Sequence, residues 1–409
     1  MGLIHTPNAN RLHISLFGRR NSGKSSLINA LTGQDIALVS DTAGTTTDPV
    51  SKAMEIQGIG PCLFIDTPGF DDEGELGAMR IERTWKAVER TDIALLLCGG
   101  DSSENEPDLT TELSWLQQLQ AKKIPTILLI NKVDIREGVE KLVTRIKAGT
   151  ENRMQEGANT PILISAKAGI GIDEIHQAIL EKLPEDYDQQ SITGKLVSEG
   201  DLVLLVMPQD IQAPKGRLIL PQVQTMRELL DKKCLVMSCT TDKLPDTLRA
   251  LSHPPKLIIT DSQVFKTVYE QKPESSRLTS FSVLFAGYKG DIDYYVESAA
   301  VIESLNESSR ILIAEACSHA PKSEDIGRVK LPMLLRKRIG EKLSIDIVAG
   351  TDFPQDLTPY SLIIHCGACM FNRKYVLSRI ERAKEQHIPM TNYGVAIAWL
   401  NGILNQIEY

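Results

Sequence analysis

The sequence lacks any apolar run of the ~18 residues that a membrane-spanning helix needs. Its apolar stretches, such as 127–130, have the length of buried strands. Residues 1–11 contain no apolar core, so we expect no signal peptide. Basic residues are not in excess either, since 45 Lys and Arg face 53 Asp and Glu, for a net charge of −8. This balance argues against partners that are nucleic acids or anionic membranes.

Cysteine is scarce, with seven residues in 409, and an odd number makes a disulfide framework a poor explanation. We therefore expect a reducing, cytoplasmic location in which some thiols are free to bind metal. What the chain does have is a 42% hydrophobic content, enough for several cores. At about 150 residues per domain, the length predicts two or three domains.

Three stretches follow from the alternation of short apolar strands and helical patterns, which is typical of α/β folds. We expect a doubly wound, mainly parallel α/β sheet in 1–186, a small α/β domain in 187–270 and a second α/β layer in 271–409. The expected strands are 12–17, 62–65, 93–97, 124–130, 161–164, 201–207, 234–238, 256–259, 282–286, 310–316, 344–348 and 361–364.

The segment 18–25, GRRNSGKS, follows an expected strand and opens a helical pattern, which is the context of a Walker A loop. Its glycines let the backbone approach phosphate, and the amides of the loop face the anion. Lys24 is expected to reach the β- and γ-phosphates and Ser25 to bind Mg²⁺. The contacting residues would be Asn21, Ser22, Gly23, Lys24, Ser25 and Ser26.

Three further motifs follow in order, each at the carboxyl end of an expected strand, where ligands of open α/β sheets bind. In 66–69, DTPG, Asp66 can hold the Mg²⁺ shell and the Gly69 amide can sense the γ-phosphate. In 131–134, NKVD, with Asn131, Lys132 and Asp134, a carboxylate can accept hydrogen bonds from guanine N1 and N2 together, which adenine does not offer. The motif 165–167 (Ser165, Ala166, Lys167) would support guanine O6. Together the motifs predict a GTP site.

With 44–48, GTTTD, as switch I, this set resembles the Era/TrmE-type branch of small GTPases. The resemblance implies that Thr46 is a Mg²⁺ ligand and that Asn21 helps to bind K⁺. The residue after the DTPG motif is Phe70, where a glutamine would orient the attacking water. Hydrolysis must then depend on K⁺ or on an acidic residue such as Asp71, Asp72, Glu73 or Glu75, and we expect it to be slow.

Two short clusters of Cys and His lie in the third stretch. Cys317 and His319 follow the expected strand 310–316, and His365, Cys366 and Cys369 follow the expected strand 361–364. If these strands are parallel neighbours, both clusters meet at one sheet edge, and the glycine at 367 would let the backbone turn around a metal. The donor set leaves two metals open: Zn²⁺ with three Cys and one His, or a 4Fe–4S cluster held by three thiolates.

The combination of this GTPase pattern with Cys-x-His and His-Cys-x-x-Cys, 45 residues apart, resembles the HydF-type (FeFe) hydrogenase maturation GTPases over essentially the whole chain. The resemblance implies a dimerising middle domain and a 4Fe–4S cluster on Cys317, Cys366 and Cys369, with His319 and His365 as less certain ligands. It also implies a scaffold that receives a di-iron precursor made with two radical-SAM maturases and passes it to apo-hydrogenase.

Two other functions compete with this interpretation. One is a GTPase of tRNA modification or ribosome assembly, against which the acidic balance and the absence of a basic, aromatic-interleaved patch argue. The other is a GTP-regulated zinc protein that only binds partners. The metal in purified protein separates the last from an iron–sulfur protein.

Overall fold

The computed structural model describes residues 7–32, 50–56, 58–70, 75–99, 108–150, 160–184, 187, 191–208, 218–316 and 326–409. The chain forms two compact units, Met1–Tyr187 and Asp188–Tyr409, which are described separately below. In the described residues, no helix is both long and apolar enough to cross a membrane.

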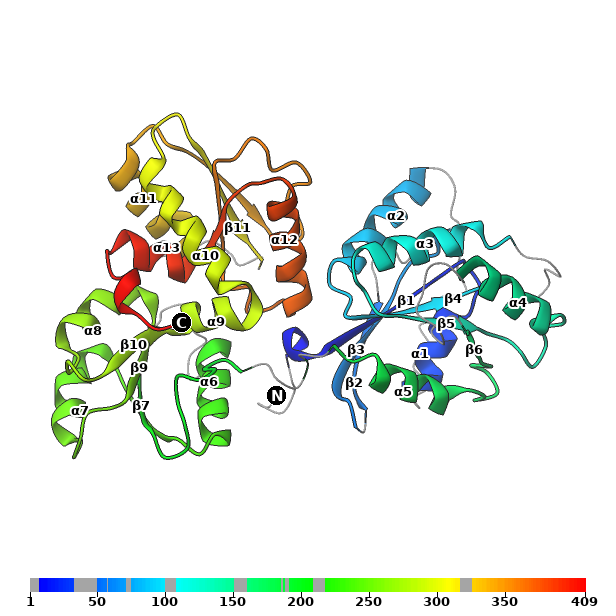
Figure 1. Cartoon of the computed structure of the whole chain (residues 1–409), viewed down its shortest axis with the longest axis horizontal. Coiled ribbons are helices and arrows are strands. Elements are labelled where there is room, and N and C mark those ends of the chain that lie inside the picture. Colours follow the sequence, from blue (N-terminus) through cyan, green and yellow to red (C-terminus); the bar gives the residue numbers. More distant parts are fainter. Residues whose placement is uncertain are drawn as a thin grey trace. The chain divides into compact units, whose positions relative to one another are not determined.

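The first unit is a six-stranded sheet in the order β2-β3-β1-β4-β5-β6, parallel except for the β2–β3 pair. The central strands are apolar on both faces because helices cover both sides of the sheet, with α1 and α5 on one side and α2, α3 and α4 on the other (Figure 1). Its elements are β1 (Leu12–Gly18), α1 (Lys24–Thr32), β2 (Val50–Ile56), β3 (Gly60–Asp66), α2 (Glu75–Val88), β4 (Ile93–Leu97), α3 (Thr110–Ala121), β5 (Thr126–Ile130), α4 (Val139–Thr150), β6 (Ile162–Leu163) and α5 (Ile172–Glu181).

The second unit contains two parallel four-stranded sheets, ordered β10-β9-β7-β8 and β12-β11-β13-β14. The helices between the two sheets bury one continuous core that includes Leu204 and Ile258 of the first sheet and Leu312 and Ile363 of the other (Figure 1). The elements around the first sheet are β7 (Leu202–Val206), α6 (Leu220–Asp231), β8 (Leu235–Cys239), α7 (Leu244–Ala250), β9 (Leu257–Thr260), α8 (Phe265–Gln271), β10 (Arg277–Ser280) and α9 (Phe281–Lys289).

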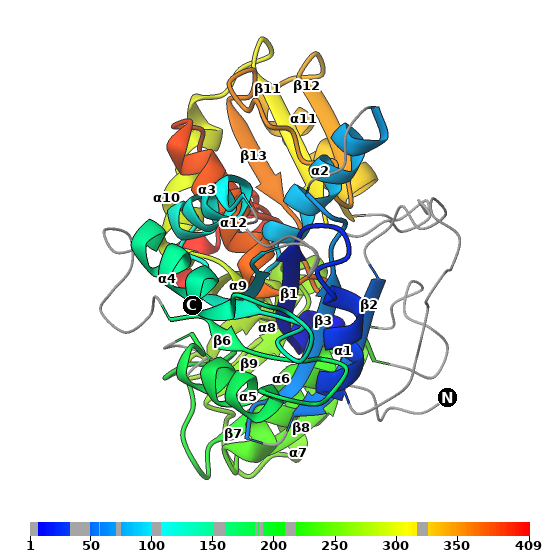
Figure 2. The same cartoon turned by 90° about the vertical axis from the view of Figure 1, so that its right-hand side faces the viewer.

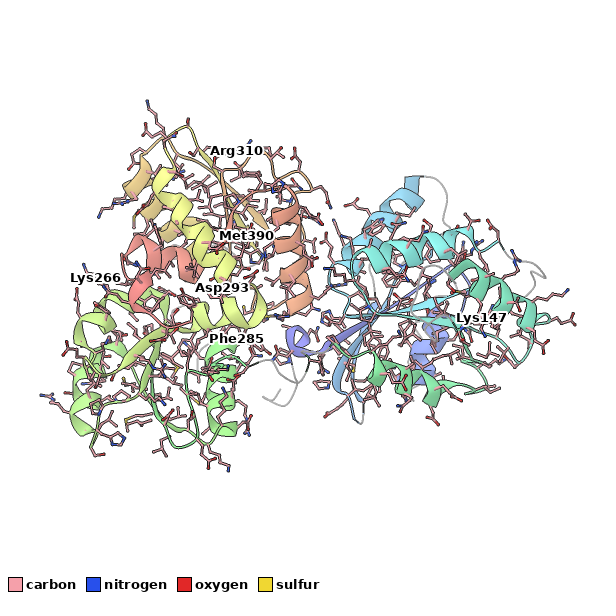
Figure 3. All side chains as sticks on the ribbon, in the orientation of Figure 1. Lys147, Lys266, Phe285, Asp293, Arg310 and Met390 are labelled. Carbon is pink, nitrogen blue, oxygen red and sulfur yellow. The ribbon has the colours of Figure 1, made fainter. Side chains whose placement is uncertain are left out.

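The rest of this unit surrounds the second of these sheets, whose strands β11, β12 and β13 lie side by side in Figure 2. Exposed charged side chains such as Lys266 and Arg310 point outward, whereas Met390 is buried (Figure 3). The elements are α10 (Ile292–Ala299), β11 (Arg310–Glu315), a π-helical turn (Ile326–Lys330), α11 (Leu331–Ile339), β12 (Ser344–Ala349), β13 (Leu362–His365), α12 (Arg373–Glu385), β14 (Met390–Asn392) and α13 (Tyr393–Leu400).

The expected α/β class is confirmed, and so is the parallel pairing of the strands that precede the two cysteine clusters. The expected strand at 282–286 is wrong, because this apolar stretch is the helix α9. Ser280 caps that helix by accepting a hydrogen bond from the Val283 amide, and a short apolar run does not by itself distinguish strand from helix. The strand is instead β10, which belongs to the sheet of β7, so the two sheets divide after β10, later than the expected boundary at 270.

Candidate functional site: a phosphate-binding loop and a cysteine loop

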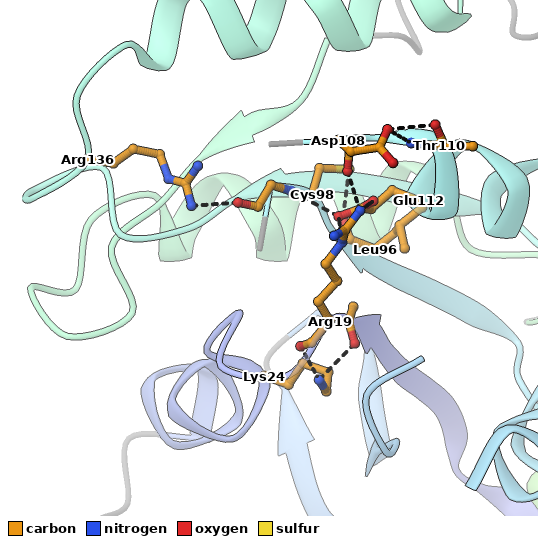
Figure 4. Close-up of polar contacts among 10 residues, drawn as sticks. Arg19, Lys24, Leu96, Cys98, Asp108, Thr110, Glu112 and Arg136 are labelled. Carbon is orange, nitrogen blue, oxygen red and sulfur yellow. Dashed lines mark hydrogen bonds and ion pairs between the residues drawn. The ribbon is translucent and has the colours of Figure 1, made fainter. Parts of the chain in front are cut away.

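The phosphate-binding loop joins β1 to α1, and its lysine is folded against the loop's own backbone. The Lys24 ammonium donates hydrogen bonds to the carbonyl oxygens of Gly18 at 2.9 Å and Arg19 at 2.8 Å (Figure 4). The buried Lys24 is therefore held where the loop's amides converge, which is the position from which it can reach a phosphate chain.

The two residues expected to organise Mg²⁺ lie next to each other. The Ser25 hydroxyl donates to a carboxylate oxygen of Asp66 at 2.5 Å, at the end of β3. Burial raises the pKa of Asp66, and the hydrogen bond from Ser25 and the charge of Lys24 offset only part of that effect. The other Asp66 oxygen is buried and has no partner among the described residues. A hydroxyl and a carboxylate so placed fit a hard cation with oxygen ligands.

Asn131 ties the phosphate-binding loop to both base-recognition motifs. Its side-chain amide donates to the Ser22 carbonyl at 3.0 Å, and its carbonyl oxygen accepts from the amides of Lys132 at 2.8 Å and Ala166 at 3.1 Å. Gly23, with φ 92°, passes so close to Asn131 that a Cβ there would overlap the Asn131 amide. This one buried residue thus fixes three loops in register.

The groups expected to contact the base and the cation face outward. Asp134 and Lys167 are exposed beside the buried Asn131, so that their side chains are accessible to a guanine. Asn21 is exposed and adopts a left-handed backbone conformation with φ 58°. Ser26 is also exposed at the start of α1, whereas Ser22 is buried. The structure brings all these residues to the carboxyl ends of β1, β5 and β6.

The switch regions lie mostly outside the described residues. This holds for 44–48, with Thr46, and for the acidic residues 71–73, while Glu75 begins α2. Gly69 is described, and Phe70 after it is buried and stacks on Trp115, with ring centroids 5.5 Å apart. Because Phe70 packs in the core and carries no polar group, it does not orient a water molecule.

Sequence reasoning missed an ion pair that fixes the phosphate-binding loop to α3. The Arg19 guanidinium contacts both carboxylate oxygens of Glu112, at 2.9 and 3.0 Å, and also donates to the Asp108 carbonyl (Figure 4). Glu112 is only 1% exposed. The signal in the sequence is weak: a glutamate on the apolar face of a helix, where a buried carboxylate needs a partner.

The cysteine loop follows β13 at the edge where β11 also ends. The sulfur of Cys366 accepts hydrogen bonds from the amides of Ala316 at 3.0 Å and Ala368 at 3.4 Å. Cys317 and His319 lie outside the described residues, but Ala316 immediately precedes Cys317. On either side of that segment, Glu315 and Arg328 form an ion pair at 3.0 Å. The chain leading to Cys317 therefore arrives beside Cys366.

The turn that presents the two thiols differs from expectation in one detail. Ala368, not the glycine at 367, takes the left-handed conformation, with φ 46°. A left-handed non-glycine residue is strained and persists where its surroundings hold it. Ala368 is buried, and its carbonyl accepts a hydrogen bond from Lys289 at 3.0 Å. These interactions stabilise the left-handed conformation.

His365 is fully buried, and both of its ring nitrogens are occupied. Nε2 lies 2.8 Å from a guanidinium nitrogen of Arg379, which can only donate, so the ring proton is on Nδ1 and is donated to the Cys366 carbonyl at 2.6 Å. Burial, and then the charge of Arg379, lower the pKa of His365 to about 3. In this arrangement His365 orients the cysteine loop and has no free lone pair for a metal.

The donor set fits a thiolate-bound metal, although within the described ranges no group of three His, Cys, Asp or Glu surrounds a common point. Two thiols come from one turn, Cys366 and Cys369, and a third would come from Cys317. Burial raises the pKa of the Cys366 thiol, and the N–H groups of Ala316 and Ala368 act against this by favouring the thiolate. Amides that donate to sulfur are a feature of iron–sulfur ligation.

Comparison with known families assigns the three parts of the chain. Residues 13–132 match the model of the 50S ribosome-binding GTPase family, 192–290 that of the Hydrogen maturase F dimerization domain and 293–407 that of the Hydrogen maturase F tetramerization domain. The last two together cover more than half of the chain.

Two curated relatives match the GTPase part. The tRNA modification GTPase MnmE of Laribacter hongkongensis is 36% identical over 171 residues, which are 42% of this chain and 34% of that protein. MnmE of Chromobacterium violaceum is 38% identical over 174 residues, 42% and 35% of the two chains. The chain therefore spans about a third of the length of these relatives.

Two solved structures show a likeness to part of the chain. Era of Aquifex aeolicus bound to GDP.AlF4- is 20% identical, with a TM-score of 0.36 over 59% of this chain and 98% of that one. A probable GTP-binding protein engB is 26% identical, with a TM-score of 0.34 over 42% and 97%.

The GTPase likeness alone leaves the remainder of the chain unassigned, since the curated relatives share only that part. The two models that follow it, joined to a GTPase domain in one polypeptide, settle the family. The chain belongs to the hydrogen maturase F family.

Proposed function

We propose that this protein is a GTP-hydrolysing scaffold that assembles or holds a di-iron precursor and delivers it to apo-(FeFe) hydrogenase. One observation carries the proposal: the Ala316 amide lies 3.0 Å from the Cys366 sulfur, so the two cysteine segments leave the sheet side by side. Such convergence is what a metal centre with thiolates from distant parts of the chain requires. Membership of the hydrogen maturase F family supports the same conclusion.

The nucleotide half hydrolyses GTP to GDP and phosphate. Lys24 neutralises the β- and γ-phosphates, while Ser25 and Asp66, with Thr46 from switch I, organise Mg²⁺. Asp134 selects guanine. Since Phe70 is packed against Trp115, the attacking water needs another group, and K⁺ held by Asn21 fits slow, K⁺-stimulated turnover.

The cysteine half holds a 4Fe–4S cluster on Cys317, Cys366 and Cys369, in a reducing cytoplasm that keeps the thiols available. When bound, three thiolates leave one iron without a protein sulfur, where another metal complex can attach. Of the two histidines considered as ligands, His319 suits the fourth position better, because both nitrogens of His365 are hydrogen bonded. The di-iron unit is cargo on this site.

A second copy of the chain is the expected partner of the middle sheet. β8 is the edge strand of that sheet, and its Leu235 and Met237 side chains are 57% and 38% exposed. An exposed apolar edge strand is a template for pairing with another strand. A homodimer joined along β8 covers it, and the match of 192–290 to a dimerization domain supports this.

GTP acts on transfer through affinity and not through chemistry at the cluster. A nucleotide shifts a conformational equilibrium only by binding two states differently. We expect GTP to alter the switch regions and so the release of hydrogenase or of the two radical-SAM maturases. Dissociation rates of each partner, compared with GTP, with GDP and without nucleotide, test this coupling, and equal rates contradict it.

Anaerobic reconstitution with iron and sulfide tests the metal assignment. We expect brown protein that absorbs near ~400 nm and gives a 4Fe–4S EPR signal after reduction by dithionite. Variants His319→Ala and His365→Ala then report whether either histidine perturbs the open iron. Colourless protein that retains Zn²⁺ favours the zinc alternative and contradicts the proposal.

The RNA-linked alternative draws on the likeness to tRNA modification GTPases, which stops at the GTPase part. The chain's charge of −8 disfavours binding to a phosphate backbone. Retention of tRNA or ribosomal RNA at physiological salt would revive it.

A further inference from the structure

Two buried cations lie against the cysteine loop, and neither belongs to the Cys and His motif. The first is Lys289, the last residue of α9, which is 2% exposed. Its ammonium donates to the carbonyl oxygens of Ala368 at 3.0 Å, Cys369 at 3.4 Å and Phe371 at 2.7 Å. One ammonium thus forms hydrogen bonds with three carbonyls of the turn that presents Cys366 and Cys369.

The second cation is Arg379 of α12, which is 1% exposed. Its guanidinium donates to His365 Nε2 at 2.8 Å, to the Gly350 carbonyl at 2.6 Å and to the Tyr375 hydroxyl at 2.5 Å. It also lies over the rings of Phe353 and Tyr375, with 4.7 and 4.4 Å to the centroids. Its Nε is buried without a hydrogen-bond partner, and no carboxylate in the described part of the chain forms an ion pair with it.

Burying a guanidinium with dipoles and aromatic rings but no counter-ion is costly. Proteins keep such a charge where something else compensates it. The thiols of the adjoining loop can supply such negative charge, since Arg379 is linked to Cys366 through His365, whose other nitrogen bonds the Cys366 carbonyl.

We propose that the positive charges of Lys289 and Arg379, beside the Cys366–Cys369 loop, stabilise a negatively charged, thiolate-ligated metal centre and favour its reduced form. The inference rests on the proposed function, because it needs a redox-active centre on these cysteines. Three thiolates bring more negative charge than the cubane core brings positive charge. A one-electron reductant such as dithionite adds one further negative charge, which both cations stabilise.

The test is an anaerobic redox titration of the full-length reconstituted protein, followed by EPR. Lys289→Met and Arg379→Met remove one charge each at nearly constant volume, while Lys289→Arg and Arg379→Lys retain it. Lys384→Met is the matched control, because this exposed lysine lies on the same helix as Arg379 and pairs with Asp291. Iron and sulfide per chain, and circular dichroism, report loading and folding.

We expect both Met variants to shift the midpoint potential to more negative values, the charge-retaining variants to recover most of the shift, and the control to match wild type. If a Met variant does not fold, Lys289→Gln or Arg379→Gln takes its place in the titration. Glutamine removes the charge but keeps an N–H donor. If the Met or Gln variants contain the cluster and have the wild-type midpoint potential, the inference is overturned and the proposed function stands. Wild-type protein that takes up no cluster overturns both.

Discussion

The phosphate-binding loop and the cysteine loop both follow the end of a buried parallel strand, yet the arginine associated with each loop has different partners. Arg19, within the phosphate-binding loop and 18% exposed, is paired with the buried carboxylate of Glu112. The guanidinium next to the cysteine loop, Arg379, has only neutral partners in the described residues.

The difference matches what each loop is proposed to hold. A nucleotide binds together with Mg²⁺ and leaves after each cycle, so its loop needs only backbone amides and one lysine to hold it. The other cation of that loop, Arg19, is neutralised by Glu112. A resident centre with three thiolates is permanently anionic, and positive charge can be built into its support. The predictions below test this contrast, beginning with the largest expected effect.

Replacing Lys24 by Ala removes the cation expected at the phosphates, and we expect hydrolysis to fall at least ~100-fold. Iron content should not change, because Lys24 lies in the other unit. Phosphate release and iron analysis on the same preparation measure both, with the exposed Lys147→Ala on α4 as control. A parallel loss of iron would show that the two loops are not independent.

The converse change, Cys366→Ser, removes the sulfur that accepts hydrogen bonds from the amides of Ala316 and Ala368. We expect most iron and sulfide to be lost while GTP hydrolysis stays at the wild-type rate. Cys239→Ser, a half-buried thiol on β8, is the control and should keep its iron. Full iron content in Cys366→Ser would contradict the ligand assignment.

The sequence predicted the two loops unequally well. Every contact of the phosphate-binding loop with Asn131 involves a residue of a contiguous motif, because the loops of a parallel sheet meet at one edge. The cysteine motif identified the thiols but not their support. Lys289 lies 79 residues before the Ala368 carbonyl that it binds, and Arg379 lies on the helix that follows the motif; neither is part of the motif, and lysine and arginine side chains are mostly exposed.

Gly23→Ala tests how tightly Asn131 couples the nucleotide loops. The new Cβ would overlap the Asn131 amide and strain a residue at φ 92°. We expect GTP affinity to fall ~10- to 100-fold, since the overlap displaces Asn131, and overpacking of this kind costs on the order of 1–3 kcal/mol. Gly60→Ala is the matched control, because Gly60 has φ 93° but open space around its Cβ position. Equal affinity losses in both variants, measured by nucleotide titration, would attribute the effect to strain alone.

Intrinsic fluorescence can report whether the nucleotide loop rearranges while the cysteine loop does not. Phe70, which follows the DTPG motif, stacks on Trp115, which stacks on Trp85 with ring centroids 4.9 Å apart. We expect emission to differ between the GTP- and GDP-bound protein, Trp115→Phe to remove most of the difference, and Trp399→Phe to preserve it. A signal that depends on Trp399, which lies in the second unit, would point to a change that spans both units.

The smallest effect concerns a half-buried carboxylate in the region that matches the dimerization domain. Glu228 of α6 accepts hydrogen bonds from Ser191, Ile192 and Thr193, at 2.5 to 2.9 Å. Burial alone would raise the pKa of Glu228, but these hydrogen bonds outweigh it and the pKa lies below its ordinary value. A carboxylate with a lowered pKa stabilises the fold above its unfolded-state pKa, and this stability is lost as the pH falls through the folded-state pKa.

Glu228→Gln should therefore lower the free energy of unfolding of this region by ~1–3 kcal/mol at neutral pH, and the difference from wild type should shrink below pH ~4. Hydrogen exchange at the Ile192 and Thr193 amides measures it locally. Glu199→Gln is the control, since Glu199 and its partner Lys233 are both exposed and such pairs contribute little. A stability difference that persists unchanged at low pH would mean that the packing of Glu228, and not its charge, holds the segment. A difference that disappears as Glu228 becomes protonated shows that the fold stabilises its negative charge, just as the anionic centre is proposed to be stabilised by the cations beside the cysteine loop.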